Sequence, residues 1–362
     1  MPPRRPLSLR LTGAAVLRDG EMQERTVAME GGVISKGPLP EADLSGHLIL
    51  PGIVDLQSGV LAAALPGRSG PAGALAATDR ALARAGVTTA WAVQGWSWAG
   101  GVAAPEMAEA VLQALGAYRP SAGIDLRLQL ACETHMPGSL DRIVSAVRRH
   151  KLDFVTFQNS LPNEAAPGST AAAARELGGQ VPRFLCRLAD AFDTLGTLYG
   201  SRFDPDAQTR EYYSMIGAGI CVTPAAPAPA AVARAVGDAV LLPAPALLRA
   251  RAEPAPLPIL RRGQCDALVS ADAPGALVAA ALMLAKEIGL PAAWALISSR
   301  PAEILRLPDR GVIDYGRRAD LTILDAASGN VAATIVAGRL VWAAPGLSER
   351  LQQAGAPEVV AA

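Results

Sequence analysis

Strand-like and helix-like segments alternate through the middle of the chain, and this alternation is the strongest constraint on its fold. Short apolar segments are expected to form strands at residues 50–57, 87–94, 125–132, 152–158, 196–202, 219–223, 238–242 and 266–271. Helical patterns follow them, at residues 72–85, 105–117, 138–150, 170–192, 206–216, 227–236, 275–288 and 291–298. Repeated strand–helix units pack as a parallel sheet, and eight of them can close into a barrel. The pattern therefore predicts a distorted (β/α)8 TIM-type barrel over residues 50–311.

Both ends of the chain are rich in short strands instead. Residues 1–49 contain Asp19-Gly20 and Gly31-Gly32, which are typical hairpin turns, and residues 312–345 carry further strand-like segments. Two β-rich ends that flank one α/β region predict a small β-sandwich domain assembled from both termini. Residues 346–362, which are rich in Ala, Pro and Gly, are expected to fray.

Composition excludes several classes of function. The formal net charge is zero, which argues against a dominant nucleic-acid-binding surface. No apolar run reaches the roughly 18 residues that a membrane span needs, and the N-terminus lacks the apolar region of a secretion signal. Four widely spaced cysteines fit a reducing compartment. We expect a cytoplasmic protein that binds neither nucleic acid nor membrane; a homo-oligomer is compatible with the sequence.

The segment from Leu48 to Gly59 is nearly a metal-binding motif. Its Pro51-Gly52 followed by Asp55-Leu56 resembles the opening strand of the amidohydrolase superfamily, where Asp-Leu precedes His-x-His or His-x-Asp. Gln57 and Gly59 stand at the two ligand positions. A neutral amide is a poor metal ligand, and glycine has no side chain. The residues from Gly311 to Arg339 also resemble the return of this superfamily into its small β domain.

Within this superfamily, the chain resembles the diphosphatase of the carbon–phosphorus-lyase pathway, which acts on α-D-ribose 1-methylphosphonate 5-triphosphate. Residues 82–89, 126–133, 155–162 and 201–224 carry the similarity. The resemblance implies that four ligand positions are changed, to Gln57, Gly59, Ser160 and Arg202, while Glu133 and Asp272 keep the family's residue type. Catalytic zinc generally needs about three protein ligands. We therefore expect no metal and no other cofactor.

Glu133 and Asp272 are the candidate catalytic residues, although their residue context favours a structural carboxylate bonded to neighbouring groups over a catalytic one. Gln57, Gly59, His135, Ser160 and Arg202 are expected to line a pocket at the carboxyl ends of the strands. A guanidinium is always charged and cannot ligate a metal. Arg202 could therefore replace the lost cation by pairing with Asp272 or Glu133; the alternative is that it points to solvent.

Three functions remain open. The first is a degenerate, metal-free pseudoenzyme with a binding or assembly role. The second is an active hydrolase, diphosphatase-like or acting on C–N bonds, with a rebuilt site and a divalent metal such as zinc. The third is a structural subunit of a phosphonate-processing complex, with phosphonate-pathway proteins as partners. A small phosphorylated ligand would be expected to use arginines in the strand-to-helix loops: Arg68, Arg202 and Arg249.

Overall fold

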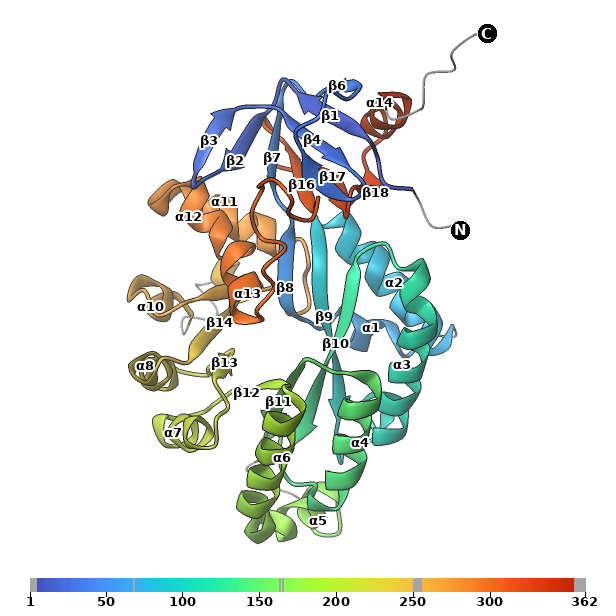
Figure 1. Ribbon diagram of the computed structural model, residues 1–362. Coiled ribbons are helices and arrows are strands. Elements are labelled where there is room, and N and C mark those ends of the chain that lie inside the picture. Colours follow the sequence, from blue (N-terminus) through green and yellow to red (C-terminus); the bar gives the residue numbers. More distant parts are fainter. Residues whose placement is uncertain (1–4, 68, 163, 165, 250–255, 355–362) are drawn as a thin grey trace.

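An eight-stranded parallel sheet forms the centre of the computed structural model, which describes residues 5–67, 69–162, 164, 166–249 and 256–354 (Figure 1). The strands lie in chain order, and a further bridge between Ser58 and Ala271 brings the last strand back to the first. This confirms the predicted barrel. Its strands are β8 (Ile53–Ser58), β9 (Val87–Trp96), β10 (Asp125–Glu133), β11 (Phe154–Gln158), β12 (Leu198–Arg202), β13 (Ile220–Val222), β14 (Ala239–Pro243) and β15 (Ala267–Val269).

Helices follow the strands and cover the outside of the barrel (Figure 1). The expected helix at 170–192 is divided by a 3₁₀ turn at Leu177–Gln180, because Gly178-Gly179 disfavours a continuous helix. Three more 3₁₀ turns lie at Gly101–Ala103, Arg119–Ser121 and Pro137–Ser139. The barrel helices are α1 (Val60–Ala64), α2 (Gly70–Arg84), α3 (Pro105–Tyr118), α4 (Leu140–His150), α5 (Thr170–Glu176), α6 (Val181–Leu195), α7 (Ala207–Met215), α8 (Pro227–Val236), α9 (Ala244–Leu248), α10 (Pro256–Arg261), α11 (Ala276–Ile288), α12 (Leu290–Ala295) and α13 (Ser299–Ile304).

A small β domain is built from both ends of the chain, as predicted. One sheet has the order β18-β17-β16-β7-β2-β3 and the other β5-β4-β1-β6. The two ends meet where β7 pairs antiparallel with β16, so that Pro51 lies opposite Leu321. The strands are β1 (Leu9–Thr12), β2 (Ala15–Arg18), β3 (Glu21–Glu24), β4 (Val27–Glu30), β5 (Val33–Ser35), β6 (Glu41–Asp43), β7 (His47–Pro51), β16 (Leu321–Asp325), β17 (Val331–Val336) and β18 (Arg339–Ala343).

The tail is more ordered than its composition suggested. Residues Leu347–Ala354 form helix α14, so the expectation that 346–362 frays is wrong for this stretch. Leu347 and Leu351 lie one helical turn apart and are both buried in the core of the small domain. This apolar pair explains why the helix docks. Residues 355–362 lie outside the described residues.

Alternation along the strands separates an apolar barrel interior from the helix-covered outside. Trp91, Phe154 and Leu241 belong to the buried interior cluster. At the amino ends of the strands, Arg310 donates to the Asp125 carboxylate at 2.7 Å and to the Thr89 hydroxyl at 2.8 Å. Burial alone would raise the pKa of Asp125, but its charged neighbours, Arg310 among them, lower it to about 2. This ion pair joins the barrel to the segment that returns to the small domain.

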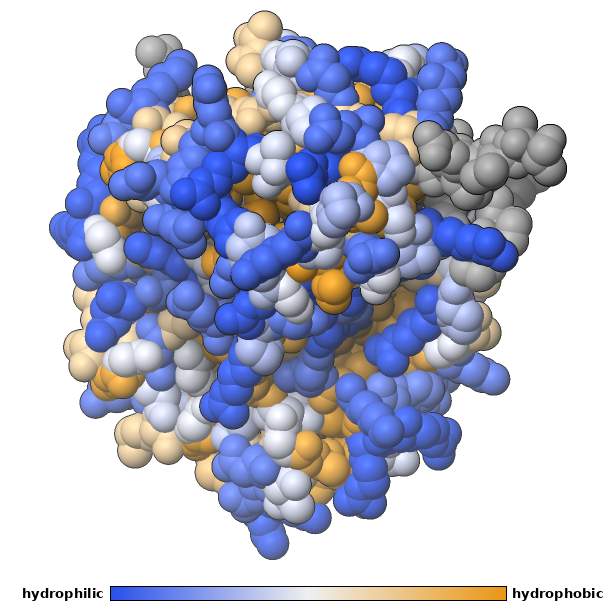
Figure 2. Space-filling model, turned by 45° about the horizontal axis from the view of Figure 1, so that its top comes forward, coloured by the Kyte–Doolittle hydropathy of each residue, from blue (hydrophilic) through white to orange (hydrophobic). Residues whose placement is uncertain are grey.

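The outer surface is mostly hydrophilic in the view of Figure 2, where apolar side chains appear as small separate patches. Within the described ranges, no helix combines the length and apolar character needed to cross a bilayer.

Candidate functional site

The carboxyl ends of the strands, where barrel enzymes place their active sites, carry a chain of hydrogen-bonded polar side chains. Glu133 ends β10 and is fully buried. It accepts hydrogen bonds from the Gln158 side chain at 3.0 Å, from the backbone N–H of Ser160 at 3.2 Å and from the Ser160 hydroxyl. Gln158 is the cross-strand neighbour of Glu133, and Ser160 lies just beyond the end of β11. The neighbouring strand thus satisfies both carboxylate oxygens.

Arg202 ends β12 and extends this chain by one residue. It is the cross-strand neighbour of Gln158, and its Nη1 donates to Gln158 Oε1 at 3.2 Å. Its guanidinium carbon lies 4.7 Å from the centre of the Phe203 ring. Burial lowers the pKa of Arg202 to about 10, although the negative charge of Glu133 acts in the opposite direction. The cation is therefore held in a place where its charge is poorly solvated.

The expected ion pair of Arg202 with Glu133 or Asp272 is not found. Across the described part of the chain, Arg202 has no carboxylate within 4.0 Å, and its buried Nε has no hydrogen-bond partner. The reason is geometric: β10 and β12 are separated by β11, and neighbouring strands lie about 4.8 Å apart. Gln158 on the intervening strand therefore bridges the two charges, with its carbonyl oxygen toward Arg202 and its amide nitrogen toward Glu133.

Gln57 and Gly59 lie at the end of β8, where the first strand of the barrel meets the segment after the last strand. Gln57 is nearly fully buried, and its Oε1 lies 3.5 Å from the Thr223 hydroxyl after β13. The N–H of Gly59 donates to the carbonyl of Ala271. A Cβ on Gly59 would lie 3.1 Å from that same carbonyl oxygen. The backbone of the last strand segment thus fills the space beside Gly59.

Asp272 and His135 stay apart from the chain formed by Glu133, Gln158, Ser160 and Arg202. Asp272 lies in an exposed turn after β15, and no hydrogen bond joins it to any other residue that the structure describes. His135 is half-buried, with Nδ1 2.9 Å from the Thr134 hydroxyl. Burial lowers the pKa of His135, Glu133 raises it and Arg175 lowers it again. The imidazole is therefore neutral at pH 7 and does not supply a second cation.

The donor set at this site does not fit a catalytic transition metal. Over the described residues, no three His, Cys, Asp or Glu side chains lie close enough together to hold a metal ion. The positions implied by the superfamily resemblance present an amide, a glycine, a hydroxyl and a guanidinium: Gln57, Gly59, Ser160 and Arg202. The carboxylate bonded to Ser160, Glu133, already accepts three hydrogen bonds. Zinc generally requires about three nitrogen, sulfur or carboxylate ligands.

Below the chain of polar residues, the barrel wall carries unsatisfied polar groups. Gln129 on β10 is fully buried, and neither atom of its amide has a partner within the described ranges. The same holds for the hydroxyl of Thr156 on β11. Both residues share the strand face of Glu133 and Gln158, because side chains alternate along a strand. Buried polar groups normally have a hydrogen-bond partner, so this part of the barrel wall is suited to binding a polar ligand.

Sequence reasoning missed Gln158, although it lies on the inward face of a predicted strand. It also missed Arg210 on α7, which is fully buried and pairs with Asp204 at 3.4 Å and with Asp238 at 3.1 Å. Arg210 additionally donates to the Ser201 hydroxyl at 2.8 Å. The Arg210 guanidinium is completely paired, unlike that of the partly buried Arg202. Of the two other arginines expected to bind a phosphorylated ligand, Arg68 lies outside the described residues, and Arg249 directly follows α9.

Comparison of the fold with solved structures identifies amidohydrolase-superfamily proteins. A prolidase complexed with N-methylphosphonate-L-proline has a TM-score of 0.67 and 16% identity, over 93% of this chain and 100% of its own. N-acetyl-D-glucosamine-6-phosphate deacetylase from Mycobacterium smegmatis has a TM-score of 0.63 and 17% identity, over 92% and 99%. The β-aspartyl dipeptidase of Fervidobacterium islandicum has a TM-score of 0.65 and 16% identity, over 92% and 96%.

No protein-family model matches the chain, and neither does any curated protein sequence. At these levels of identity the structural similarity shows the fold alone. The chain therefore has the fold seen in amidohydrolases, a TIM barrel with a β-sandwich domain formed by both termini.

Proposed function

We propose that the protein is a metal-free, non-hydrolytic member of the amidohydrolase superfamily that binds a small acidic ligand at the carboxyl end of its barrel. One observation carries the proposal: Arg202 holds a partly buried cation, with its Nε fully enclosed, whose only polar partner among the described residues is the neutral Gln158 amide. A buried charge without a counterion is costly. An anionic group bound from solvent would complete this site, since a guanidinium binds carboxylate, phosphate and phosphonate through paired hydrogen bonds.

The proposed ligand carries a phosphate or phosphonate group. The resemblance to the phosphonate-pathway diphosphatase supports this choice. So do the solved neighbours, of which one was complexed with N-methylphosphonate-L-proline and another with N-acetyl-D-glucosamine-6-phosphate. The unsatisfied amide of Gln129 and hydroxyl of Thr156 provide further polar groups on the same wall. Assembly with phosphonate-pathway proteins is the accompanying proposal for its cellular role.

The active-hydrolase alternative requires a base or a metal-bound water that the site does not readily provide. Glu133 is engaged by its neighbours, and Asp272 lies in an exposed turn. A hydrolase with a rebuilt site would therefore have to rearrange β11 to free Glu133. The structural-subunit alternative needs no ligand at all, and the same experiment separates it from the other two.

The test combines elemental analysis with ligand binding. Protein purified with zinc, manganese and magnesium available is expected to retain no stoichiometric metal. Methylphosphonate is expected to bind the wild type by calorimetry, to lose on the order of tenfold or more in affinity with Arg202→Met, and to be unaffected by Arg183→Gln. Arg183 is exposed on α6 and serves as a charge-matched control.

A stoichiometric metal would overturn the proposal in favour of the hydrolase. Failure of both methylphosphonate and phosphate to bind would overturn it in favour of the structural subunit.

A further inference from the structure

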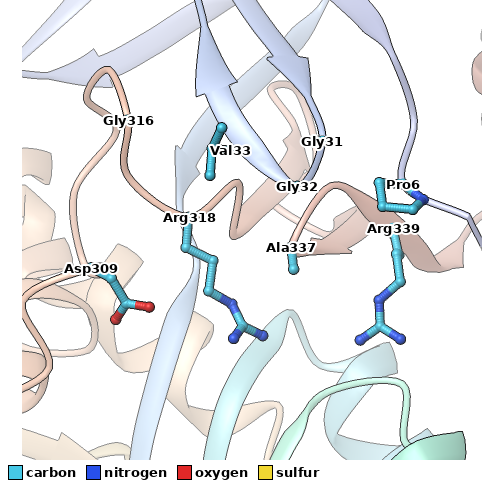
Figure 3. Close-up of a pocket in the computed structure, with 9 residues that line it drawn as sticks. All are labelled: Pro6, Gly31, Gly32, Val33, Asp309, Gly316, Arg318, Ala337 and Arg339. Carbon is cyan, nitrogen blue, oxygen red and sulfur yellow. The ribbon is translucent and has the colours of Figure 1, made fainter.

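A hollow lies between the small domain and the amino end of the barrel, whereas Glu133 and Arg202 lie at the carboxyl ends of the strands. It has a volume of about 450 Å³, within the range of small-molecule sites. Its lining includes the turn Gly31-Gly32, Asp309, Arg318, Ala337 and Arg339. Figure 3 shows the side chains of Arg318 and Arg339 extending in the same direction from neighbouring backbone segments. The hollow therefore presents two guanidinium groups to one space.

Backbone hydrogen bonds hold the two arginines in place. The N–H of Gly338, which precedes Arg339, donates to the carbonyl of Ala319, which follows Arg318, at 2.9 Å. The N–H of Ala319 donates in turn to the carbonyl of Gly32 at 2.9 Å. A Cβ on Gly32 would lie 3.0 Å from the carbonyl oxygen of Ala337, so a larger residue would push these turns apart. The backbone hydrogen bonds thus fix the spacing between Arg318 and Arg339 in the absence of a ligand.

Two acids lie near the hollow, and each already accepts hydrogen bonds from an arginine. Asp309 accepts hydrogen bonds from Arg310 at 2.9 and 3.1 Å. Asp320 is buried and accepts from Arg318 Nε at 2.9 Å and from the N–H of Ala337 at 2.7 Å. Arg318 therefore uses only its Nε, and neither of its terminal nitrogens has a hydrogen-bond partner among the described residues.

Arg339 carries the uncompensated charge of the hollow. Its Nη2 contacts the Gly123 carbonyl at 3.3 Å, and within the described ranges no carboxylate lies within 4.0 Å of its guanidinium. Gly123 belongs to the barrel, in the loop before β10, whereas Arg339 begins β18 of the small domain. The free donors of both arginines thus lie at the junction of the two domains.

We infer that this hollow is a binding site for a phosphate-bearing anion, formed by Arg318 and Arg339. Two planar guanidinium groups with free donors match the several acceptor oxygens of a phosphate ester or pyrophosphate. The volume exceeds that of one phosphate group, so a phosphorylated small molecule fits better than a lone ion. This site is independent of Arg202 and of the function proposed for the carboxyl end of the barrel, which we call the barrel mouth. A ligand bound here would contact both domains at once.

The test is calorimetric titration of the intact protein with inorganic pyrophosphate at constant ionic strength, using four variants. Arg339→Gln removes the uncompensated cation and is expected to weaken binding on the order of tenfold or more. Arg318→Lys keeps a cation beside Asp320, so the fold is preserved, while it removes the planar fork; it should weaken binding by a smaller factor. Arg183→Gln is the charge-matched control, and Arg202→Met tests the barrel mouth; neither should weaken the pyrophosphate site.

A single site that loses affinity in Arg339→Gln and is preserved in Arg183→Gln and Arg202→Met supports the inference. Three results would overturn it: no binding to the wild type at millimolar pyrophosphate, equal affinity in Arg339→Gln, or equal losses in Arg339→Gln and Arg183→Gln. A loss found only in Arg202→Met would also overturn it, because the pyrophosphate would then occupy the barrel mouth.

Discussion

The hydroxyl of Ser270 donates a 2.5 Å hydrogen bond to the buried carboxylate of Asp55, joining the segment after the last barrel strand to the first strand. The same carboxylate accepts the backbone N–H groups of Ser270 at 3.0 Å and Gln57 at 3.2 Å. Burial raises the pKa of Asp55 above its ordinary value, and these hydrogen bonds offset only part of that effect. The folded protein therefore holds this proton more tightly than the unfolded chain does. The stability that this protonated carboxyl contributes is fully present below the pKa of Asp55 in the unfolded chain. It is lost as the pH rises through the pKa of Asp55 in the folded protein.

Asp55→Asn should remove this pH dependence while keeping one oxygen for the backbone N–H groups. The free energy of unfolding of the variant, relative to the wild type, is expected to increase as the pH rises from about 4 to about 7. Urea unfolding at a series of pH values measures it. Asp272→Asn, a substitution of an exposed carboxylate, is the control and should follow the wild type. Parallel curves for Asp55→Asn and the wild type would contradict the assigned shift.

Arg202 and Arg210 should respond differently to the same substitution. Arg202→Met removes an uncompensated cation, so its free energy of unfolding should stay within about 1 kcal/mol of the wild type or exceed it. Arg210→Met leaves Asp204 buried without its cation and should cost about 3–5 kcal/mol. Chemical denaturation compares the two variants directly. A large loss of unfolding free energy in Arg202→Met would show that this guanidinium stabilises the fold. It would also remove the argument for an anion bound at the barrel mouth.

Glu133 and Asp272 are expected to contribute very differently to the stability of the fold. Glu133→Gln replaces one acceptor oxygen by an amide group facing the donors of Gln158 and Ser160, and should destabilise the fold by about 1–3 kcal/mol. Asp272→Asn should change stability by no more than about 0.5 kcal/mol. Thermal unfolding of both variants checks this. Equal effects would mean that Asp272 has a buried partner.

Restoring two histidines should not restore a metal site. In Gln57→His/Gly59→His, the new Cβ at residue 59 would lie 3.1 Å from the Ala271 carbonyl oxygen, so the second imidazole would fit only if the last strand segment moved away. We expect less than one zinc per chain by elemental analysis after dialysis, and a lower melting temperature than that of Gln57→His alone. Stoichiometric zinc accompanied by a higher melting temperature would contradict this prediction.

The architecture was predictable because it depends on local patterns. The strands were located to within a few residues, including the short β12, since strand-forming runs and glycine turns are properties of neighbouring residues. Helix α14 was not expected, because its stability comes from burying Leu347 and Leu351 in the core of the small domain, where the helix packs against β17, β18 and, from the other end of the chain, β6. Composition alone cannot show such a contact.

The site was only partly predictable for a similar reason. The replaced ligand positions were evident from the sequence, but the bridge through Gln158 depends on strand register, which places β11 between Glu133 and Arg202. Asp272 keeps the residue type expected at a barrel strand end, yet it lies exposed in the turn after β15. Ala271 there has a positive φ of 50°, which redirects the chain at that point. A one-residue change of direction cannot be read from residue types.

The pairing of β7 with β16 also affects how the protein is made. Strand β7 is synthesised early, but its partner leaves the ribosome only after the whole barrel, at roughly 5–20 residues per second. For tens of seconds the apolar edge formed by Leu48, Ile49 and Leu50 has no β16 to pair with. During that interval the nascent chain exposes one unpaired edge of β7, and open strand edges of this kind promote aggregation. Production of this protein should therefore depend on chaperones and on slow synthesis, and truncation before residue 321 should yield insoluble chains.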